Sequence, residues 1–210
     1  MHAHKFFTEE EKERIHQAVV AAEQRTSGEI VPMIVGASGR YAEVNQAGLV
    51  AGLIAGTVCA LIFSDPWSEL HSQLLWPLLG ATLGFLLCHV PAIKRRLIPR
   101  RRIDEDVHER CLAAFTEHGL HYTKANTGVL ILASLFERRV QVLADRGIHE
   151  KVPEGTWDEV VRIITAGLKS GDACAAFCNA IQRCGDILAT HFPRQADDRQ
   201  ELDDKLVEEE

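Results

Sequence analysis

Two long runs without charged residues dominate the pattern of hydrophobic and polar positions in this chain. The first covers 44–64, around the segment AGLVAGLIAGTVCALIF, and the second covers 70–93. An α-helix rises about 1.5 Å per residue, so about 20 residues cross the roughly 30 Å hydrocarbon core of a membrane. Both runs are long enough, and neither has a polar stripe. The pattern predicts a transmembrane hairpin with spans at about 44–63 and 74–93; the alternative is a pair of buried helices in a soluble core.

A basic block, KRRLIPRRR at 94–102, follows the second run directly. It places six positive charges in nine residues of a chain whose formal net charge is -7. Such a block is typical of a nucleic-acid patch, a localisation signal or the cytoplasmic flank of a membrane span. The preceding apolar run favours the flank, and because the rest of the chain is acidic, no nucleic acid is expected as a partner. The bases expected to contact anionic lipid are Lys94, Arg95, Arg96, Arg100, Arg101 and Arg102.

The flanks of the two runs also predict an orientation. The loop SDPWSE at 64–69 carries two acids and no base. Positively charged flanks stay on the cytoplasmic side. We therefore expect the loop to face outward and both termini to face the cytoplasm. The N-terminal segment MHAHKFFTEEEKER is polar, so no signal peptide is expected there.

Before the hairpin, the pattern predicts one helix and one strand. Thr8 and Glu11 have the spacing of a capping box, and apolar residues recur at helical spacing after them. A β-rich run, EIVPMIVG at 29–36, follows the turn RTSG. Its Pro32 removes one donor from the ladder and argues for an edge or irregular strand.

After the hairpin, the pattern predicts a charged amphipathic helix at about 104–118 and then two strands. TGVLILASL at 127–135 is typical of a strand buried on both faces. Only FERR separates it from VQVLAD at 140–145, which indicates an antiparallel pair.

Two helices complete the predicted elements. Thr156 and Glu159 have the spacing of a second capping box, and Asp172 is placed to cap the last helix. The predicted order is a helix and a strand, the two spans, and then a helix, two strands and two helices. This order is typical of an α/β sandwich with a small mixed sheet.

The soluble segments are too short to form two ordinary domains. We therefore predict one discontinuous domain from 1–43 and 104–193, interrupted by the hairpin and its basic flank at 44–102. The segment 194–210 is rich in acids and poor in apolar residues, so we expect a flexible tail. The six cysteines suit a reducing compartment.

Three segments outside the hairpin form a distinctive series: TSGEIVPMIV, then NTGVLILASLFERRVQVLADRGIHEKVPEGTW, then IQRCGDILATHFP. This series resembles the TPM domain family, in its branch with an inserted transmembrane hairpin. The resemblance implies an α/β/α sandwich, a bacterial inner-membrane location, and roles in the assembly or repair of membrane complexes. The family also bears a phosphatase label, but a fold does not by itself imply catalysis.

The resemblance also implies candidate metal ligands. Members of the family typically read DNGVLLL and GYGLEGVLPD where this chain reads NTGVLIL and DRGIHEKVPE. Asn126 and Glu154 thus stand at aspartate positions and His149 at a glutamate position. With Asp145 they form a candidate divalent-metal site, whose mixed ligands suit zinc or manganese better than calcium. The alternative is that Asp145 and Glu154 cap a turn and a helix, while His149 is a surface residue.

Glycines recur every four residues within the predicted spans. Small residues on one stripe let membrane helices approach closely. We expect these faces to pack on each other, on a second copy or on another membrane protein; alternatively, glycine is simply common in membrane helices. The glycines concerned are Gly48, Gly52, Gly56, Gly80 and Gly84.

Two functional hypotheses follow. The first is an inner-membrane-anchored TPM-domain protein that acts as a binding or assembly module for membrane protein complexes, binding another protein or a regulatory ion. The second is a membrane-tethered acid phosphatase that depends on a divalent metal. The sequence assigns no catalytic residues, and a divalent metal ion is the one cofactor considered.

Overall fold

The computed structural model describes residues 3–63, 69–123, 125–153, 155–194, 202 and 204–209. The chain divides into two compact units. One consists of 1–38 and 104–210, and the other of 39–103. The sequence predicted the hairpin and its flank at 44–102, so the first border lies five residues earlier in the structure and the second within one residue of the prediction.

The first unit is built on a mixed four-stranded sheet with the order β3-β2-β1-β4. β1 (Glu29–Val35) runs parallel to β2 (Gly128–Ser134), and β2 runs antiparallel to β3 (Arg139–Ala144). β4 (Val207–Glu209) pairs in parallel with the end of β1. The predicted mixed sheet and the predicted antiparallel pair are confirmed.

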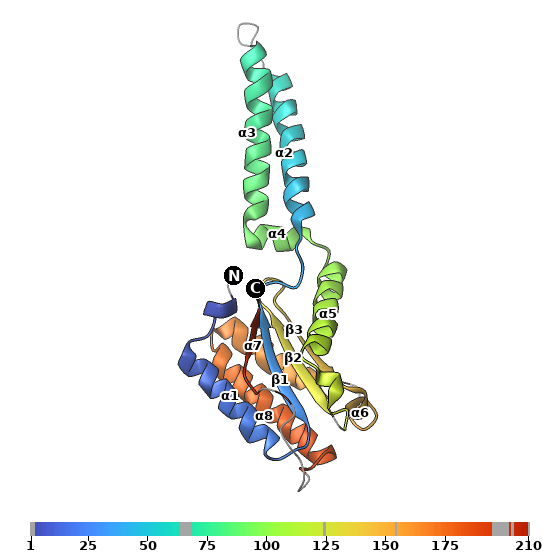
Figure 1. The fold of residues 1–210 in the computed structure, drawn as a ribbon. Coiled ribbons are helices and arrows are strands. Elements are labelled where there is room, and N and C mark those ends of the chain that lie inside the picture. Colours follow the sequence, from blue (N-terminus) through green and yellow to red (C-terminus); the bar gives the residue numbers. More distant parts are fainter. Residues whose placement is uncertain are drawn as a thin grey trace. The chain divides into compact units, whose positions relative to one another are not determined.

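Helices cover both faces of this sheet (Figure 1). Because side chains alternate along a strand, Ile30 and Ile34 of β1 enter one core and Val31 and Met33 enter the other. The larger core is closed by three helices and the smaller one by a single helix. This is the α/β/α sandwich predicted from the sequence. The helices of the larger core are α1 (Glu9–Glu23), α7 (Asp158–Ser170) and α8 (Ala173–His191), and that of the smaller core is α5 (Arg100–Glu117).

The capping box at the start of α1 is confirmed. The Thr8 hydroxyl accepts a hydrogen bond from the Glu11 amide at 3.3 Å, and the Glu11 carboxylate accepts one from the Thr8 amide at 2.8 Å. The short remaining elements of this unit are η1 (Ala3–Lys5), η2 (Leu120–Tyr122) and α6 (Arg146–His149).

The second predicted capping box does not form. Helix α7 begins at Asp158, and the Thr156 hydroxyl donates instead to the carbonyl of Pro153 at 2.7 Å. Asp172 occupies the N-cap position of α8 but makes no capping hydrogen bond with its side chain.

The structure bears on two expectations about the edge of the sheet. Pro32 does lie in an edge portion of β1, because β4 pairs with β1 only from Met33 onward. The tail expected to be flexible instead supplies β4. Its acids are held by bases of the helices: Lys12 lies 2.8 Å from Glu208, and Arg110 forms an ion pair with Glu209.

The second unit contains α2 (Ala42–Phe63), α3 (Glu69–His89) and α4 (Pro91–Leu97). α2 is long and apolar enough to span a membrane. A bend of 91° separates α3 from α4, and these two helices are long and apolar enough to span a membrane only when they are counted together as one broken span. The predicted second span therefore ends at His89 and not at 93, because Pro91 disfavours helical geometry at Val90. The predicted loop lies largely at 64–68, outside the described residues.

Candidate functional site

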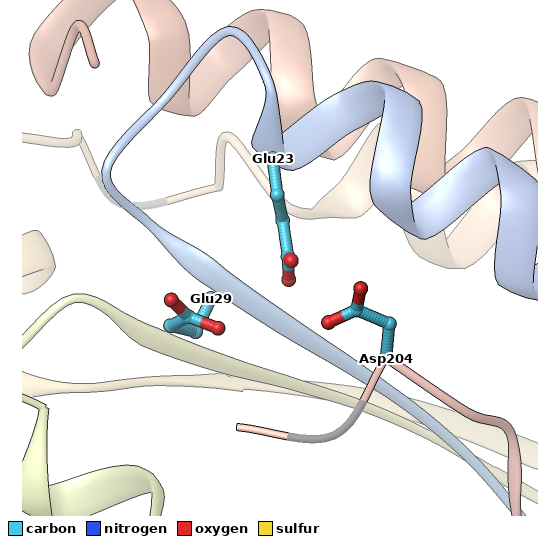
Figure 2. Close-up of side chains that lie close together, drawn as sticks. All are labelled: Glu23, Glu29 and Asp204. Atoms are coloured by element: carbon cyan, nitrogen blue, oxygen red, sulfur yellow. The ribbon is translucent and has the colours of Figure 1, made fainter. Parts of the chain in front are cut away.

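Three carboxylates converge at one end of the sheet of the first unit (Figure 2). Glu23 ends α1, Glu29 begins β1, and Asp204 lies in the C-terminal segment just before β4. One oxygen of each carboxylate lies within 4.8 Å of the others. Segments from both ends of the chain thus meet at this cluster.

Glu23 has a structural reason to point toward β1. Its carboxylate accepts a hydrogen bond from the amide of Ile30 at 2.7 Å. Pro32, two residues further, has no amide hydrogen, and β4 pairs with β1 only from Met33 onward. Glu23 therefore satisfies a backbone donor in the part of β1 that β4 does not reach.

The other two carboxylates are buried. Glu29 is 7% exposed and its amide donates to the carbonyl of Thr127 at 3.2 Å. Asp204 is 5% exposed, and its Oδ1 atom has no hydrogen-bond partner among the described residues. The backbone carbonyl of Asp204 lies 3.3 Å from Nδ1 of His16. Buried carboxylate oxygens are stable only when they are bonded, protonated or bound to a cation.

The electrostatics of the cluster follow from this geometry. Burial raises the pKa of Glu23 to about 9. The charges of Glu29 and Asp204 and a hydrogen bond with the Asp204 side chain add to the rise, and the hydrogen bond from Ile30 opposes it. Without a cation, Glu23 therefore keeps its proton at neutral pH. With one, three carboxylates become available as hard oxygen ligands, the type that Ca²⁺, Mg²⁺ and Mn²⁺ prefer.

Asn126 and Asp145, two of the metal ligands predicted from the family resemblance, lie at the same end of the sheet. Asp145 donates its backbone amide to Gly128, which begins β2 and pairs with Glu29. Asn126 is exposed and has a positive φ of 52°, and its carbonyl packs against Gly147. The segment around Asn126 and the segment around Gly147 therefore lie side by side.

The side chains of the predicted set have different environments. Asp145 caps α6: its Oδ1 accepts from the amide of Arg146 at 2.6 Å, while Oδ2 is buried without a partner among the described residues. His149 is exposed at the end of α6, and Glu154 lies outside the described residues. Capping was the alternative to metal binding that the sequence left open for Asp145. A metal site at these residues and a phosphatase activity stay predictions.

The glycine faces of the second unit lie between α2 and α3. A Cβ atom built on Gly52 would overlap backbone atoms of Gly80, and one on Gly48 would overlap the carbonyl of Gly84. Gly56 packs in the same way against the backbone of α3, at Trp76 and Pro77. Of the three alternatives open from the sequence, this structure has the two helices packed on each other.

The basic block occupies α4 and the first residues of α5. Lys94, Arg95 and Arg96 lie in the last turn of α4. Arg102 forms an ion pair with Glu43 at 2.8 Å, and its guanidinium lies 5.9 Å from the ring centroid of Tyr41. Arg100 and Arg101 begin α5 and are exposed.

Sequence reasoning missed the carboxylate cluster. Glu23 and Glu29 stand on either side of a turn, and Asp204 lies in a segment expected to be flexible. The one local signal was Glu29, an acid at the first position of a strand whose residues are all buried.

Comparison with known proteins finds one family model that matches part of the chain. Residues 96–187, which contain α5, η2, β2, β3, α6 and α7 and parts of α4 and α8, match the TPM domain. This part of the chain is therefore similar to the TPM domain. This confirms the resemblance, whereas the TPM branch with an inserted hairpin stays a prediction.

A solved structure shares the fold of this TPM-domain chain. The NMR structure of the BA42 protein from the psychrophilic bacterium Bizionia argentinensis superposes with a TM-score of 0.61 at 21% sequence identity. The match covers 97% of this chain and 96% of BA42. A search of curated proteins finds no match. At this identity, the likeness to BA42 shows the fold alone.

Proposed function

We propose that this TPM-domain chain is anchored in the bacterial inner membrane by the α2–α3 hairpin and acts there as a binding or assembly module for membrane protein complexes. The observation that carries the proposal is the surface of the hairpin. Glycines occupy the interface between the helices, while large apolar side chains point away from it. These exposed side chains include Leu53, Ile54, Val58, Leu61, Ile62, Leu74, Leu78, Leu79, Leu83 and Leu86.

The cost of leaving this surface in water supports a lipid environment. Complete burial of a leucine or isoleucine contributes roughly 1.5–3 kcal/mol. Ile54 is 60% exposed and Leu61 71%, so each such residue forgoes about 1–2 kcal/mol in water. Summed over the whole set, the free energy forgone in water is comparable to the roughly 5–15 kcal/mol by which a typical domain is stable. A bilayer removes this cost.

Polar groups on the hairpin support the same environment. The hydroxyl of Thr57 donates to the carbonyl of Leu53 at 2.9 Å, and that of Thr82 donates to the carbonyl of Leu78 at 2.8 Å. In hydrocarbon every polar group must be satisfied within the protein. These hydroxyls meet that requirement within their own helix.

The basic block supports a cytoplasmic position for both termini. It begins immediately after the bend that ends α3, where a flank retained on the cytoplasmic side would be expected. Exposed bases near an anionic surface contribute about 1 kcal/mol each. The lipid bilayer is thus the first partner of the proposed module.

Fractionation of cells that express the full chain tests the anchor. The protein should stay in the membrane pellet after an alkaline carbonate wash and enter solution only with detergent. Recovery of the intact chain in a supernatant without detergent would remove the anchor from the proposal.

Topology mapping tests the orientation. Tags at either end should resist a reagent that enters only the periplasm, and a tag in the 64–68 loop should react. A matched variant with glutamine at the six bases should still pellet but lose its uniform orientation. A terminal tag that reacts in the unsubstituted chain contradicts the model of two spans with both ends inside.

Cross-linking in intact membranes tests the binding role. A photo-reactive residue on exposed positions of α2, such as Ile54, should give one discrete product with a membrane protein. A chain that yields no product and purifies as a partnerless monomer contradicts the module. Hydrolysis of a generic phosphomonoester that requires a divalent ion and is lost in Asp145→Asn would favour the phosphatase instead.

A further inference from the structure

We propose that Glu23, Glu29 and Asp204 bind one hard divalent cation, with Ca²⁺ the best fit, and that this cation holds the C-terminal segment against the sheet. The site differs from the set Asn126, Asp145, His149 and Glu154 predicted from the family resemblance. It also does not depend on the membrane anchor, because all three residues belong to the first unit.

The donor atoms determine the class of cation. All three side chains offer carboxylate oxygens, which favour Ca²⁺, Mg²⁺ or Mn²⁺ over softer metals. Ca²⁺ binds oxygen at about 2.3–2.6 Å, so two of its ligands can stand up to about 5 Å apart, whereas Mg²⁺ ligands are at most about 4.2 Å apart. The oxygens here lie within 4.8 Å of one another. Ca²⁺ accommodates every separation within this limit, whereas Mg²⁺ accommodates only those up to about 4.2 Å.

Asp204 supplies the independent evidence for a ligand. It is only 5% exposed, and its carboxylate is directed toward Glu23 and Glu29 (Figure 2). The Oδ1 atom of this carboxylate has no hydrogen-bond partner among the described residues. A buried ionised oxygen without a partner is costly. A bound cation would satisfy this atom and neutralise most of the charge of the cluster.

The cation would also explain why an acidic segment docks beside other acids. Beyond Asp204, β4 is held by bases, through Lys12 with Glu208 and Arg110 with Glu209. At Asp204 the neighbouring side chains in the cluster are themselves carboxylates. The cation would play there the part that Lys12 and Arg110 play at β4, so cation binding and docking of the segment become coupled.

Calorimetric titration of the full chain with CaCl₂ tests the proposal, in detergent micelles after removal of metal with a chelator. We expect binding of one Ca²⁺ at this site, with Mg²⁺ weaker. Loss of a direct ligand should weaken binding at least about tenfold, since even supporting residues of metal sites contribute 10–100-fold. Asp204→Asn and Glu23→Gln should both show this loss. Because two variants are measured, the test remains valid if one of them fails to fold.

Two further variants locate the ion. Glu10→Gln removes an exposed acid from the same helix as Glu23 and should leave Ca²⁺ affinity unchanged. Asp145→Asn should also leave this binding event unchanged. Loss of binding in Asp145→Asn but not in Asp204→Asn would place the ion at the other set and overturn the proposal, as would a chain that binds no Ca²⁺.

Hydrogen exchange tests the coupling to the C-terminal segment. Ca²⁺ should slow amide exchange at Val207–Glu209 in the unsubstituted chain and not in Asp204→Asn. Equal slowing in both proteins would show that the ion acts elsewhere. Neither readout requires a membrane, so a failure of this site would leave the proposed anchor untouched.

Discussion

Gly52 of α2 and Gly80 of α3 pack backbone to backbone. A methyl group added to either glycine would overlap the carbonyl oxygen of the other. The same contact recurs one turn away between Gly48 and Gly84. The separation of the two helices is therefore fixed by residues that lack a side chain, and this leaves their larger residues to face outward.

Replacing Gly52 should open the hairpin. Gly52→Val forces its side chain into the backbone of α3, and overpacking of this kind typically costs about 1–3 kcal/mol. Unfolding of the full chain in mixed micelles with increasing SDS should report this loss. Ala51→Val adds the same kind of bulk at an exposed neighbouring position and should change stability little. Equal effects of both variants would mean that the glycine face does not hold the helices together.

Phe177 should be among the most sensitive positions of the TPM domain. It is fully buried, and its ring meets that of Phe7 edge to face, with centroids 5.6 Å apart. Phe177→Ala should lower the free energy of unfolding by about 3–5 kcal/mol. Thermal unfolding in mild detergent would measure it. Leu112→Ala, at a side chain that is 46% exposed on α5, provides the control and should cost far less; similar losses in the two variants would contradict this core.

The stability of the metal-free protein should fall as pH rises. The pKa of Glu23 is raised from 4.5 to about 9, so between these values the folded chain retains a proton that the unfolded chain releases. The folded state then binds more protons than the unfolded state, and the free energy of unfolding decreases with pH across this window. The contribution is fully present below pH 4.5 and is lost as pH passes 9.

Glu23→Gln identifies the group responsible. Its amide cannot ionise but can still accept from Ile30, so this variant should show a flatter dependence on pH when unfolding is measured with chelator present. Glu10→Gln should keep the slope of the unsubstituted chain. Parallel curves for Glu23→Gln and the unsubstituted chain would assign the pH dependence to other groups.

Lys12 should hold β4 on the sheet. Its ammonium lies 2.8 Å from Glu208 and 2.9 Å from Glu9, and these contacts raise its pKa, that with Glu208 most. The pair is largely buried, with Lys12 24% and Glu208 10% exposed. Lys12→Gln should therefore speed amide exchange at Val207–Glu209 by about fivefold or more, since even exposed ion pairs contribute up to about 1 kcal/mol. High salt should reduce the difference, and Lys5→Gln should have no effect. Exchange that is unchanged in Lys12→Gln would show that this ion pair does not anchor β4.

Local sequence patterns predicted those parts of the fold that are decided locally. The Thr8–Glu11 box was predicted because both partners lie within one turn of helix. The strands β2 and β3 were predicted because a continuous apolar run and a four-residue connection leave few alternatives. The box at Thr156 has the same spacing as the first, but α7 begins only at Asp158, with Trp157 at the N-cap, and the Thr156 hydroxyl donates to the carbonyl of Pro153.

The remainder depended on contacts between distant residues. VEE in β4 has no strand signal within an acidic tail. It becomes a strand because Met33–Val35 of β1 pair with it and the bases Lys12 and Arg110 bind its acids. The carboxylate cluster was missed for the same reason, since Asp204 enters it only through that docking. The second span was predicted to extend to 93, beyond the end of α3 at His89, because the absence of charged residues gives no sign of a bend. Pro91 is the residue that could have indicated it.

The position of the hairpin between paired strands sets an order for biosynthesis. β1 and β2 are neighbours in the sheet, yet roughly a hundred residues separate them along the chain, and the hairpin lies in that interval. At about 5–20 residues per second, a ribosome needs several seconds to supply β2 after β1 has emerged. The apolar helices are thus made while the nascent domain has no partner for its first strand. The sheet can therefore close only after the hairpin has been synthesised, so a hairpin that misfolds or aggregates at that stage would also keep β1 from its partner.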